Sequence, residues 1–308
     1  MKSFLSPLFI RDDFRQCHAF SLLVLYCLVY VLPLYTSAAT RASAGRLRDA
    51  PEVIRARIRF VSYSTALCSS WTFLLLRNFE EPSPWHLMGY WPPGFVDACK
   101  TLLLTSILFA GPLYECMIID GAWRYWSRME PLRLLRTDWA MWRNMVAGPI
   151  TEECLFRSSA VPLLLTAGCS LKSIILLSPL VFGLAHVHHF CEFRITHPQA
   201  PLWAAIARSV LQFSYTTIFG AYATFLFLRT GSLIAVIAVH TLCNSMGLPR
   251  VHGVLEPYWV PDGEFRQNKN IIRWTVPYYL LLVGGSVLWW KSLLPWTKSS
   301  MALASFGT

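Results

Sequence analysis

The sequence predicts an all-α fold, a polytopic transmembrane helix bundle of about eight spans, and two observations carry this prediction. Of the 308 residues, 55% are hydrophobic and 14% are charged, whereas soluble domains carry about 25% charged residues. In addition, four windows contain no Asp, Glu, Lys or Arg and approach the roughly 20 residues that a helix needs to cross a bilayer. These windows lie between Arg15 and Arg41, Arg59 and Arg77, Arg208 and Arg229, and Arg273 and Lys291.

The remaining four spans are predicted from apolar stretches that are shorter or interrupted by charges, at about 97–119, 139–168, 172–187 and 232–247. The first span ends in the small residues TSAAT, as a cleavable signal peptide does. However, its apolar core is long and a basic loop follows it, which favours an uncleaved signal anchor. Because no soluble domain or internal repeat separates the spans, we expect one integral membrane domain over residues 1–308.

The net charge of +10 is spread over the loops between the predicted spans and does not form one patch, so we expect no nucleic-acid partner. Fifteen Lys and Arg residues fall in one set of loops, at 41–59, 120–138, 188–202 and 248–273, against eight on the other side. The positive-inside rule places the richer set in the cytosol and both termini across the membrane. The nine cysteines form no CxxC pair, which favours reduced, buried thiols over a disulfide or zinc framework.

Several polar side chains lie inside apolar stretches, where a charge at the centre of a span costs at least ~2.5–3.5 kcal/mol. They occur in three segments, GPITEECLFR, LLSPLVFGLAH and HTLCN. The candidate site residues are Glu152, Glu153, Arg157, His186, His240 and Asn244. His188, His189 and His197 follow the second segment, and we expect them to be loop or membrane-surface histidines.

The spacing of these residues predicts that they converge. If the helix over 139–168 turns and returns as 172–187, Glu152 and His186 lie about 24 and 21 Å from the turn, at nearly the same depth. His240 and Asn244 are four residues apart and share one helix face. Ordinary structural roles stay open for each cluster: a helix ion pair between Glu153 and Arg157, a satisfied core histidine, or polar contacts between helices.

The residue types fit the hydrolysis of an amide bond. A carboxylate and a neutral histidine around one water form a general base, and a second histidine with an asparagine amide can stabilise an oxyanion. Zinc is an alternative with Glu152, His186 and His240 as ligands. Against it, HExxH is absent, and the helix of His240 supplies no carboxylate to orient that ring. A thiol mechanism through Cys154 is disfavoured because this residue faces about 200° around the helix from Glu152, and the GxSxG elbow of serine hydrolases is absent.

Three segments carry a family resemblance: RNMVAGPITEECLFRS (143–158), FGLAHVHHF (182–190) and HTLCNSMGLP (240–249). They resemble the EExxxR, FxxxH and HxxxN signatures of the type II CAAX prenyl endopeptidases, the Ras-converting proteases. This family lies within the CPBP/ABI superfamily of intramembrane proteases. The three signatures occur in the family's order, and the resemblance covers about 95–250, which implies that this segment is the catalytic core.

The resemblance implies an endopeptidase that removes the C-terminal tripeptide from farnesylated or geranylgeranylated CAAX proteins, such as small GTPases, at the lipid bilayer. It implies that Glu152 with His186 activates water and that His240 with Asn244 forms the oxyanion site. Glu153 and Arg157 would support the catalytic helix, and neither a cofactor nor a metal is expected. The implied location is the endoplasmic reticulum membrane, as a multi-pass protein. Because the superfamily also contains scaffolding members, a non-catalytic membrane binding protein stays the alternative.

Overall fold

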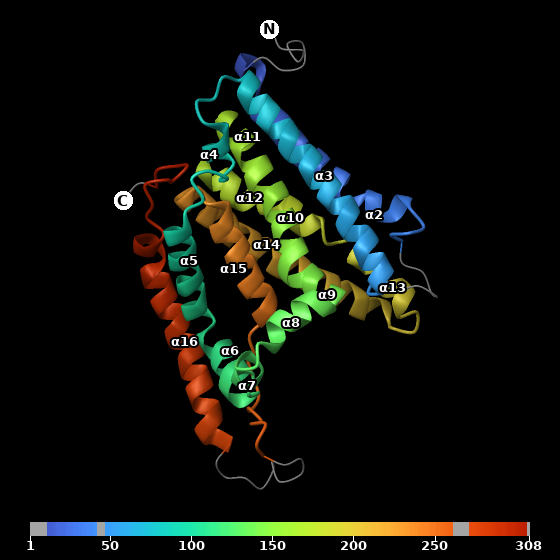
Figure 1. The fold of residues 1–308 in the computed structure, drawn as a ribbon, viewed down its shortest axis with the longest axis vertical. Helices are drawn as coiled ribbons and strands as arrows, with labels where there is room; N and C mark the ends of the chain where they lie inside the picture. Colours follow the sequence, from blue (N-terminus) through green and yellow to red (C-terminus); the bar gives the residue numbers. More distant parts are fainter. Residues whose placement is uncertain (1–10, 42–46, 261–270, 307–308) are drawn as a thin grey trace.

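The computed structural model of the chain describes residues 11–41, 47–260 and 271–306, and all regular secondary structure within them is helical (Figure 1). The two long helices of the N-terminal part are α1 (Gln16–Val31) and α3 (Pro51–Asn78), with the short η1 (Arg11–Asp13) and α2 (Pro33–Thr36) beside them. The C-terminal part contains α14 (Leu202–Thr230), α15 (Leu233–Met246) and α16 (Ile271–Trp296).

The middle of the chain consists of shorter helices. They are α4 (Pro84–Leu87), α5 (Phe95–Leu108), α6 (Ala110–Tyr114), the π-helical η2 (Glu115–Ile119), α7 (Trp123–Trp126), α8 (Glu130–Thr137), α12 (Leu171–Leu184) and α13 (His189–Thr196). In Figure 1, α16 and α5 lie along one side of the molecule, α15 packs between α5 and the centre, and α3 runs along the other side.

The predicted count of about eight spans is not confirmed. Within the described part of the chain, three helical stretches are long and apolar enough to cross a membrane, namely Gln16–Thr36, Leu171–Thr196 and Leu202–Thr230. A fourth is added if α5 and the stretch Ala110–Ile119, which are bent by 82°, count as one span. The protein is therefore an all-helical membrane protein with three or four spans by length and composition.

Three of the other four predicted spans fall short for identifiable reasons. With 14 residues, α15 is only about 21 Å long, against a hydrocarbon core of about 30 Å. In α3 the apolar part covers only the residues between Arg59 and Arg77. The stretch 139–166 contains the four charged residues Arg143, Glu152, Glu153 and Arg157, so its hydropathy is reduced by the candidate site itself.

The two sets of loops distinguished by their charge lie at opposite ends of the molecule, as predicted. In Figure 1 the start of α1, α4 and the upper end of α3 lie at the upper end, and α7, α8, α13 and the start of α16 lie toward the lower end. Contacts within the first set of segments join Arg11 to Glu81, Gln16 to Gly168, and His86 to Met301. Contacts within the second set join Arg48 to Glu192, Arg143 to Asp49, and Arg250 to Glu115. The assignment of the lower, more basic end to the cytosol stays a prediction.

The predicted helix over 139–168 is a continuous helical run with two π-helical segments in it. The run consists of α9 (Trp139–Trp142), η3 (Arg143–Ala147), α10 (Gly148–Glu153), η4 (Cys154–Ser159) and α11 (Ala160–Thr166). A π segment widens the turn locally and is frequent at functional sites. Here two of them flank α10, the segment that carries both glutamates.

The three helical runs that bear the sequence signatures each begin with a side-chain cap. Asp138 accepts hydrogen bonds from backbone N–H groups at the start of α9, and Ser170 and Ser232 do so at the starts of α12 and α15. Such caps satisfy N–H groups that lack a partner inside the helix, and each contributes about 1 kcal/mol. They fix where each run begins, and hence the depth at which its site residue lies.

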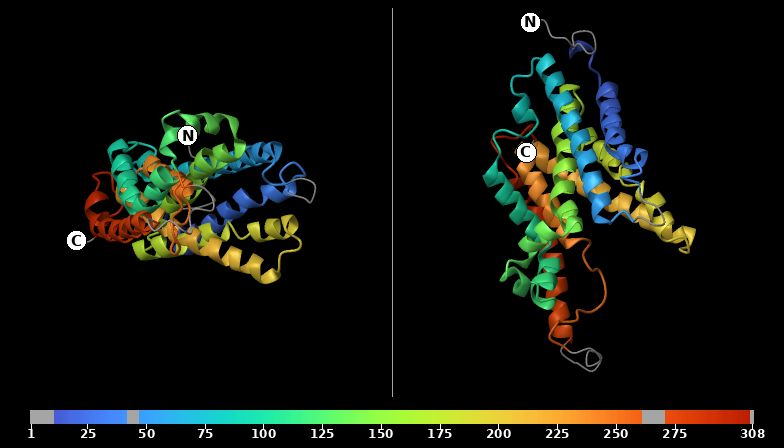
Figure 2. Two further views of the ribbon diagram at one scale, coloured as in Figure 1. Left: turned by 90° about the horizontal axis from the view of Figure 1, so that it is seen from below. Right: turned by 45° about the vertical axis from the view of Figure 1, so that its right-hand side comes forward.

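The helices α12 and α14 pack against each other (Figure 2), and they approach closely at Gly183 and Gly220. A Cβ added at Gly183 would lie 3.0 Å from the ring of Phe213 and well inside contact with Thr217 Oγ1. A Cβ at Gly220 would lie 2.9 Å from the side chain of Pro179. Glycine at both positions therefore brings the FGLAH segment against α14.

We expect Gly183→Ala to lower the apparent melting temperature in detergent, because overpacking of a filled interface costs about 1–3 kcal/mol. The matched control is Gly284→Ala, a helical glycine on α16 whose added Cβ meets nothing within 4 Å. This control should be neutral or slightly stabilising, since Ala is favoured over Gly in a helix. Equal melting temperatures for the two variants would contradict the close packing.

Candidate active site

The buried ion pair between Glu153 and Arg157 is confirmed. Arg157 Nη1 donates to Glu153 Oε1 at 3.0 Å, and the two side chains are 0% and 1% exposed. A buried pair offsets its desolvation only when further contacts satisfy both groups. Arg157 Nη2 donates to the Gly220 carbonyl at 3.1 Å, and the guanidinium lies 4.5 Å from the ring centre of Phe182. The pair therefore ties α10 and η4 to both α12 and α14.

The same carboxylate holds His240 of α15. His240 Nδ1 lies 2.6 Å from Glu153 Oε1, and the ring is buried. Because an ionised carboxylate only accepts hydrogen bonds, Nδ1 carries the proton and donates it. The sequence showed no carboxylate for His240 in its own helix; the structure supplies one from α10. The argument against zinc based on a missing orienting carboxylate is therefore wrong.

Glu152 lies on the other side of His240 from Glu153. Its Oε2 is 3.8 Å from His240 Nε2, and its side chain is 20% exposed. The imidazole thus stands between two carboxylates, hydrogen-bonded to the buried one and close to the accessible one. Of the two adjacent glutamates, Glu152 alone reaches the cavity described next.

A cavity of about 190 Å³ lies beside η3 and α10. It is lined by residues from α1, α2, the segment before α3, α3, η3, α10, η4, α13, α15 and the turn after α12. Three of the predicted site residues line it, namely Glu152, His186 and Asn244. The other three, Glu153, Arg157 and His240, lie outside its lining and contact one another. Three of the six residues therefore line the cavity, and the other three form a buried cluster outside its lining.

His186 lies in the turn just after α12, which ends three residues earlier than the predicted helix over 172–187. Its Nδ1 is 2.9 Å from the Phe182 carbonyl oxygen, and its ring stands edge-on to that of Phe182 at 5.0 Å. Since a carbonyl only accepts, Nδ1 carries the proton and Nε2 offers a lone pair. In a neutral ring held this way, Nε2 is the nitrogen that can accept a proton.

Asn244 is exposed and lies one helical turn after His240 on α15. Its Nδ2 donates one hydrogen bond, at 2.9 Å, to the backbone oxygen of Asn144 in η3. A side-chain amide has two N–H groups, so one donor remains for a ligand in the cavity. Cys154 and Cys243 do not line the cavity and pack against the hydrophobic core.

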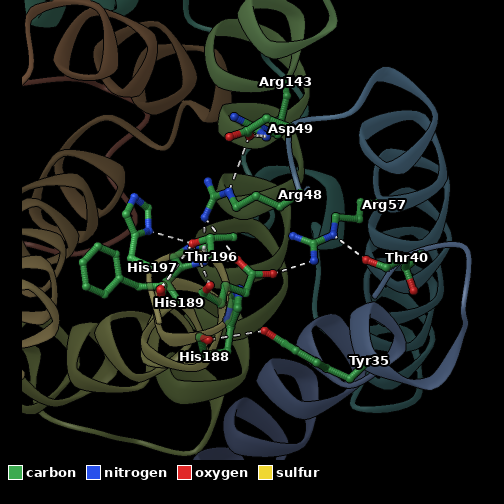
Figure 3. A network of polar contacts seen from close by, with 12 residues as sticks. Tyr35, Thr40, Arg48, Asp49, Arg57, Arg143, His188, His189, Thr196 and His197 are labelled. Carbon is green, nitrogen blue, oxygen red and sulfur yellow. Dashed lines mark hydrogen bonds and ion pairs between the residues drawn. The ribbon is translucent and has the colours of Figure 1, made fainter. Parts of the chain in front are cut away.

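His188 lies in the turn between α12 and α13, as expected for a loop histidine, whereas His189 begins α13. Neither is merely a surface residue, because both line the cavity. They belong to a polar network around Glu192, which receives charge-assisted contacts from Arg48, Arg57 and His189 (Figure 3). His197 is exposed and stacks on Phe193, as expected for a surface residue. A signal existed in the sequence: Glu192 follows His189 by three residues, a spacing that places both on one helix face.

Metal-ligating atoms gather at that network and not at the predicted zinc ligands. Among the described residues, the ligand atoms of His188, His189 and Glu192 lie within 4.8 Å of one another, whereas those of Glu152, His186 and His240 form no such group. In the cluster of His188, His189 and Glu192, Arg48 Nη1 lies 3.0 Å from His189 Nδ1 and 3.2 Å from Glu192 Oε2. A guanidinium thus already supplies positive charge at these ligand atoms.

Comparison with known proteins places this arrangement in a family. Residues 135–246, which include all six candidate residues, match the family model described as type II CAAX prenyl endopeptidase Rce1-like. The chain is 38% identical over 260 residues to the probable CAAX prenyl protease 2 of Schizosaccharomyces pombe, a match covering 83% of this chain and 86% of that protein. It belongs to the type II CAAX prenyl endopeptidase family.

Further relatives support the same assignment. The chain is 39% identical over 226 residues to human CAAX prenyl protease 2, with 68% of this chain and 66% of the human protein covered. It is 41% identical over 164 residues to that of Arabidopsis thaliana, with 48% and 52% covered. No solved structure matches the chain. The family model spans the helices from α9 to α15. The cavity is lined by residues of this part together with residues of the N-terminal part, from Tyr30 to Val61.

We expect Arg157→Met to destabilise the protein by about 3–5 kcal/mol, because it leaves the buried Glu153 carboxylate without its cationic partner. Thermal unfolding in detergent measures the loss. The matched control is Arg59→Met, which removes an exposed arginine of α3. The double variant Glu153→Gln/Arg157→Met should recover part of the loss, since no unpaired charge is then buried. An unchanged melting temperature for the single variant would contradict the importance of this pair.

Proposed function

We propose that this protein is a CAAX prenyl endopeptidase that cleaves the peptide bond after the prenylated cysteine and releases the last three residues. Family membership supports the activity. The single observation that carries the chemistry is that Glu152 and His186, from separate helical runs, line one cavity. Behind them, a buried carboxylate orients a second histidine. These are the parts that a water-activating hydrolase requires.

In the proposed mechanism, a water bound between Glu152 and His186 attacks the carbonyl carbon of the scissile bond. The Nε2 lone pair of His186 or the Glu152 carboxylate takes one proton from that water. The attack places a negative charge on the former carbonyl oxygen. Transfer of the proton to the leaving nitrogen then breaks the C–N bond, so that water and the amide become a carboxylic acid and an amine.

The proposed oxyanion donors are Asn244 and His240. Asn244 has one amide N–H beyond the hydrogen bond to Asn144, and it faces the cavity. For His240 to donate from Nε2, its ring must carry protons on both nitrogens, since Nδ1 already donates to Glu153. The charged carboxylate at 2.6 Å stabilises such a ring. In this proposal, Glu153 and Arg157 orient His240 and hold α10 in place.

The proposed substrates are farnesylated or geranylgeranylated proteins with a C-terminal CAAX sequence, such as small GTPases. A prenyl chain brings such a tail to the membrane surface. The cavity lies at the end of the bundle whose basic loops are predicted to be cytosolic, where that tail arrives. Together with the family, this orientation supports an endoplasmic reticulum membrane location.

We expect Glu152→Ala, His186→Ala and His240→Ala each to abolish cleavage of a prenylated CAAX peptide while the protein still accumulates in membranes. Asn244→Ala should reduce kcat by about 10²–10³-fold, the usual loss for one oxyanion donor. Mass spectrometry of the released tripeptide measures the activity. The matched control is His197→Ala, an exposed histidine outside the cavity.

Near wild-type turnover in any of the three alanine variants would remove that residue from the chemistry. The assay also separates an enzyme from a non-catalytic binding protein. Tight binding of the peptide by the wild-type protein, without any tripeptide release over hours, would support the scaffold alternative.

We propose that catalysis needs no metal, since Glu152 and His186 together suffice to polarise a water. Purified protein should contain well below one zinc per chain by elemental analysis and keep its activity after dialysis against a chelator. Stoichiometric zinc, with activity lost on its removal and restored on its return, would instead make Glu152, His186 and His240 candidate ligands.

A further inference from the structure

The cavity that Glu152 lines also contains a concentration of positive charge that the proposed chemistry does not use. Three arginines line the cavity together with the catalytic candidates, namely Arg48, Arg57 and Arg143. They come from the segment before α3, from α3 itself and from η3. Placing arginines close together costs free energy, because like charges repel and each guanidinium prefers a paired anion.

Arg57 has its anion within the protein. It is largely buried, and its guanidinium contacts Glu192, which is 2% exposed, and the Thr40 backbone oxygen (Figure 3). Glu192 also accepts from His189. Arg57 and Glu192 are therefore a closed internal pair, and Arg48 is a third partner at its edge.

Arg48 and Arg143 have a different environment. Their side chains are 28% and 22% exposed, and both point at one carboxylate, that of Asp49. Arg143 Nη1 lies 2.7 Å from Asp49 Oδ1, and Arg48 Nε lies 3.5 Å from the same atom. Figure 3 shows Arg48 between Asp49 and the histidine pair. The two guanidinium groups thus converge on a single carboxylate position.

Asp49 is the weakly held member of this group, since its side chain is 59% exposed. Partial burial by itself would raise the pKa of Asp49. The hydrogen bond from Arg143 and the charge of Arg48 outweigh burial and hold the pKa below its ordinary value. Within the described contact network, three guanidinium groups share the two carboxylates of Asp49 and Glu192, so the network has one positive charge in excess. Glu152, which lines the same cavity, lies against His240.

We propose that Arg48 and Arg143 bind the free C-terminal carboxylate of the substrate tail, with Asp49 occupying that position in its absence. This inference rests on the proposed function, which supplies a substrate that ends in a carboxylate three residues beyond the scissile bond. Guanidinium groups match a carboxylate in geometry as well as charge. An extended tripeptide reaches about 10 Å, so a tail can have its scissile carbonyl beside Glu152 and its carboxylate elsewhere in the same cavity.

Binding of the terminal carboxylate would let the cavity set the number of residues between the chain end and the scissile bond. A protease that must release three residues has to distinguish a chain end from the interior of a polypeptide, and only the end carries this charge. Binding the terminal carboxylate at a fixed position relative to Glu152 determines which bond faces the water.

The test uses two prenylated peptides of one sequence, one with a free C-terminal carboxylate and one with a C-terminal amide. A hydrogen bond to a charged group contributes about 1.5–3 kcal/mol, so the wild-type kcat/KM for the acid should exceed that for the amide by about tenfold or more. Arg48→Gln and Arg143→Gln should each lose this preference through a higher KM for the acid, with a much smaller effect on the KM for the amide. Asp49→Asn, which removes the competing carboxylate, should lower the KM for the acid.

The matched control is Arg55→Gln, which removes an exposed arginine of α3 outside the cavity and should keep the wild-type preference. Cleavage of the amide peptide reports on folding and on the catalytic groups in every variant. Equal KM values for acid and amide in the wild type would overturn the inference and leave the proposed function intact. Equal losses on both peptides in the arginine variants would overturn it too, in favour of a structural role. If the wild type cleaves neither peptide, the proposed function itself fails.

Discussion

The rest of the structure depends on the contacts of the Glu153 carboxylate. It is buried, and one of its oxygens receives both Arg157 and His240. The other oxygen has no hydrogen-bond partner among the described residues. A buried charge is tolerated only when its partners are fixed in place, so the pairing holds α10, η4 and α15 in a single arrangement. Arg157 extends this constraint to α14 through the Gly220 carbonyl.

That constraint explains why two adjacent glutamates have different environments. In a helix, neighbouring side chains point about 100° apart, so Glu152 faces the cavity while Glu153 faces the interior. His240 lies between them, hydrogen-bonded to one and 3.8 Å from the other. The buried glutamate thus orients the ring beside the accessible one. The proposed chemistry needs this division, because an accessible carboxylate can exchange protons with water and a buried one can fix a geometry.

The cavity also combines two kinds of charge. Glu152 supplies negative charge at one position, and Arg48, Arg57 and Arg143 supply positive charge elsewhere in the lining. The acidic part suits water activation, and the basic part suits an anionic ligand. Charged groups inside a membrane need partners, and here the site residues supply one another. These same charged residues lower the hydropathy of the stretch 139–166, so hydropathy is a poor guide to the number of spans.

The sequence by itself determined the helical class, the separation of the loops into two ends, the Glu153–Arg157 pair and the six candidate residues. These follow from local rules: apolar run length, charge bias in loops, and the spacing of residues one helical turn apart. Only the tertiary structure decided that Glu153 holds His240 and that His188 and His189 line the cavity. Contacts between residues 87 or 144 positions apart, such as Glu153 with His240 or Arg48 with Glu192, depend on how the helices pack. A pattern along one helix contains no information about the side chain that another helix brings against it.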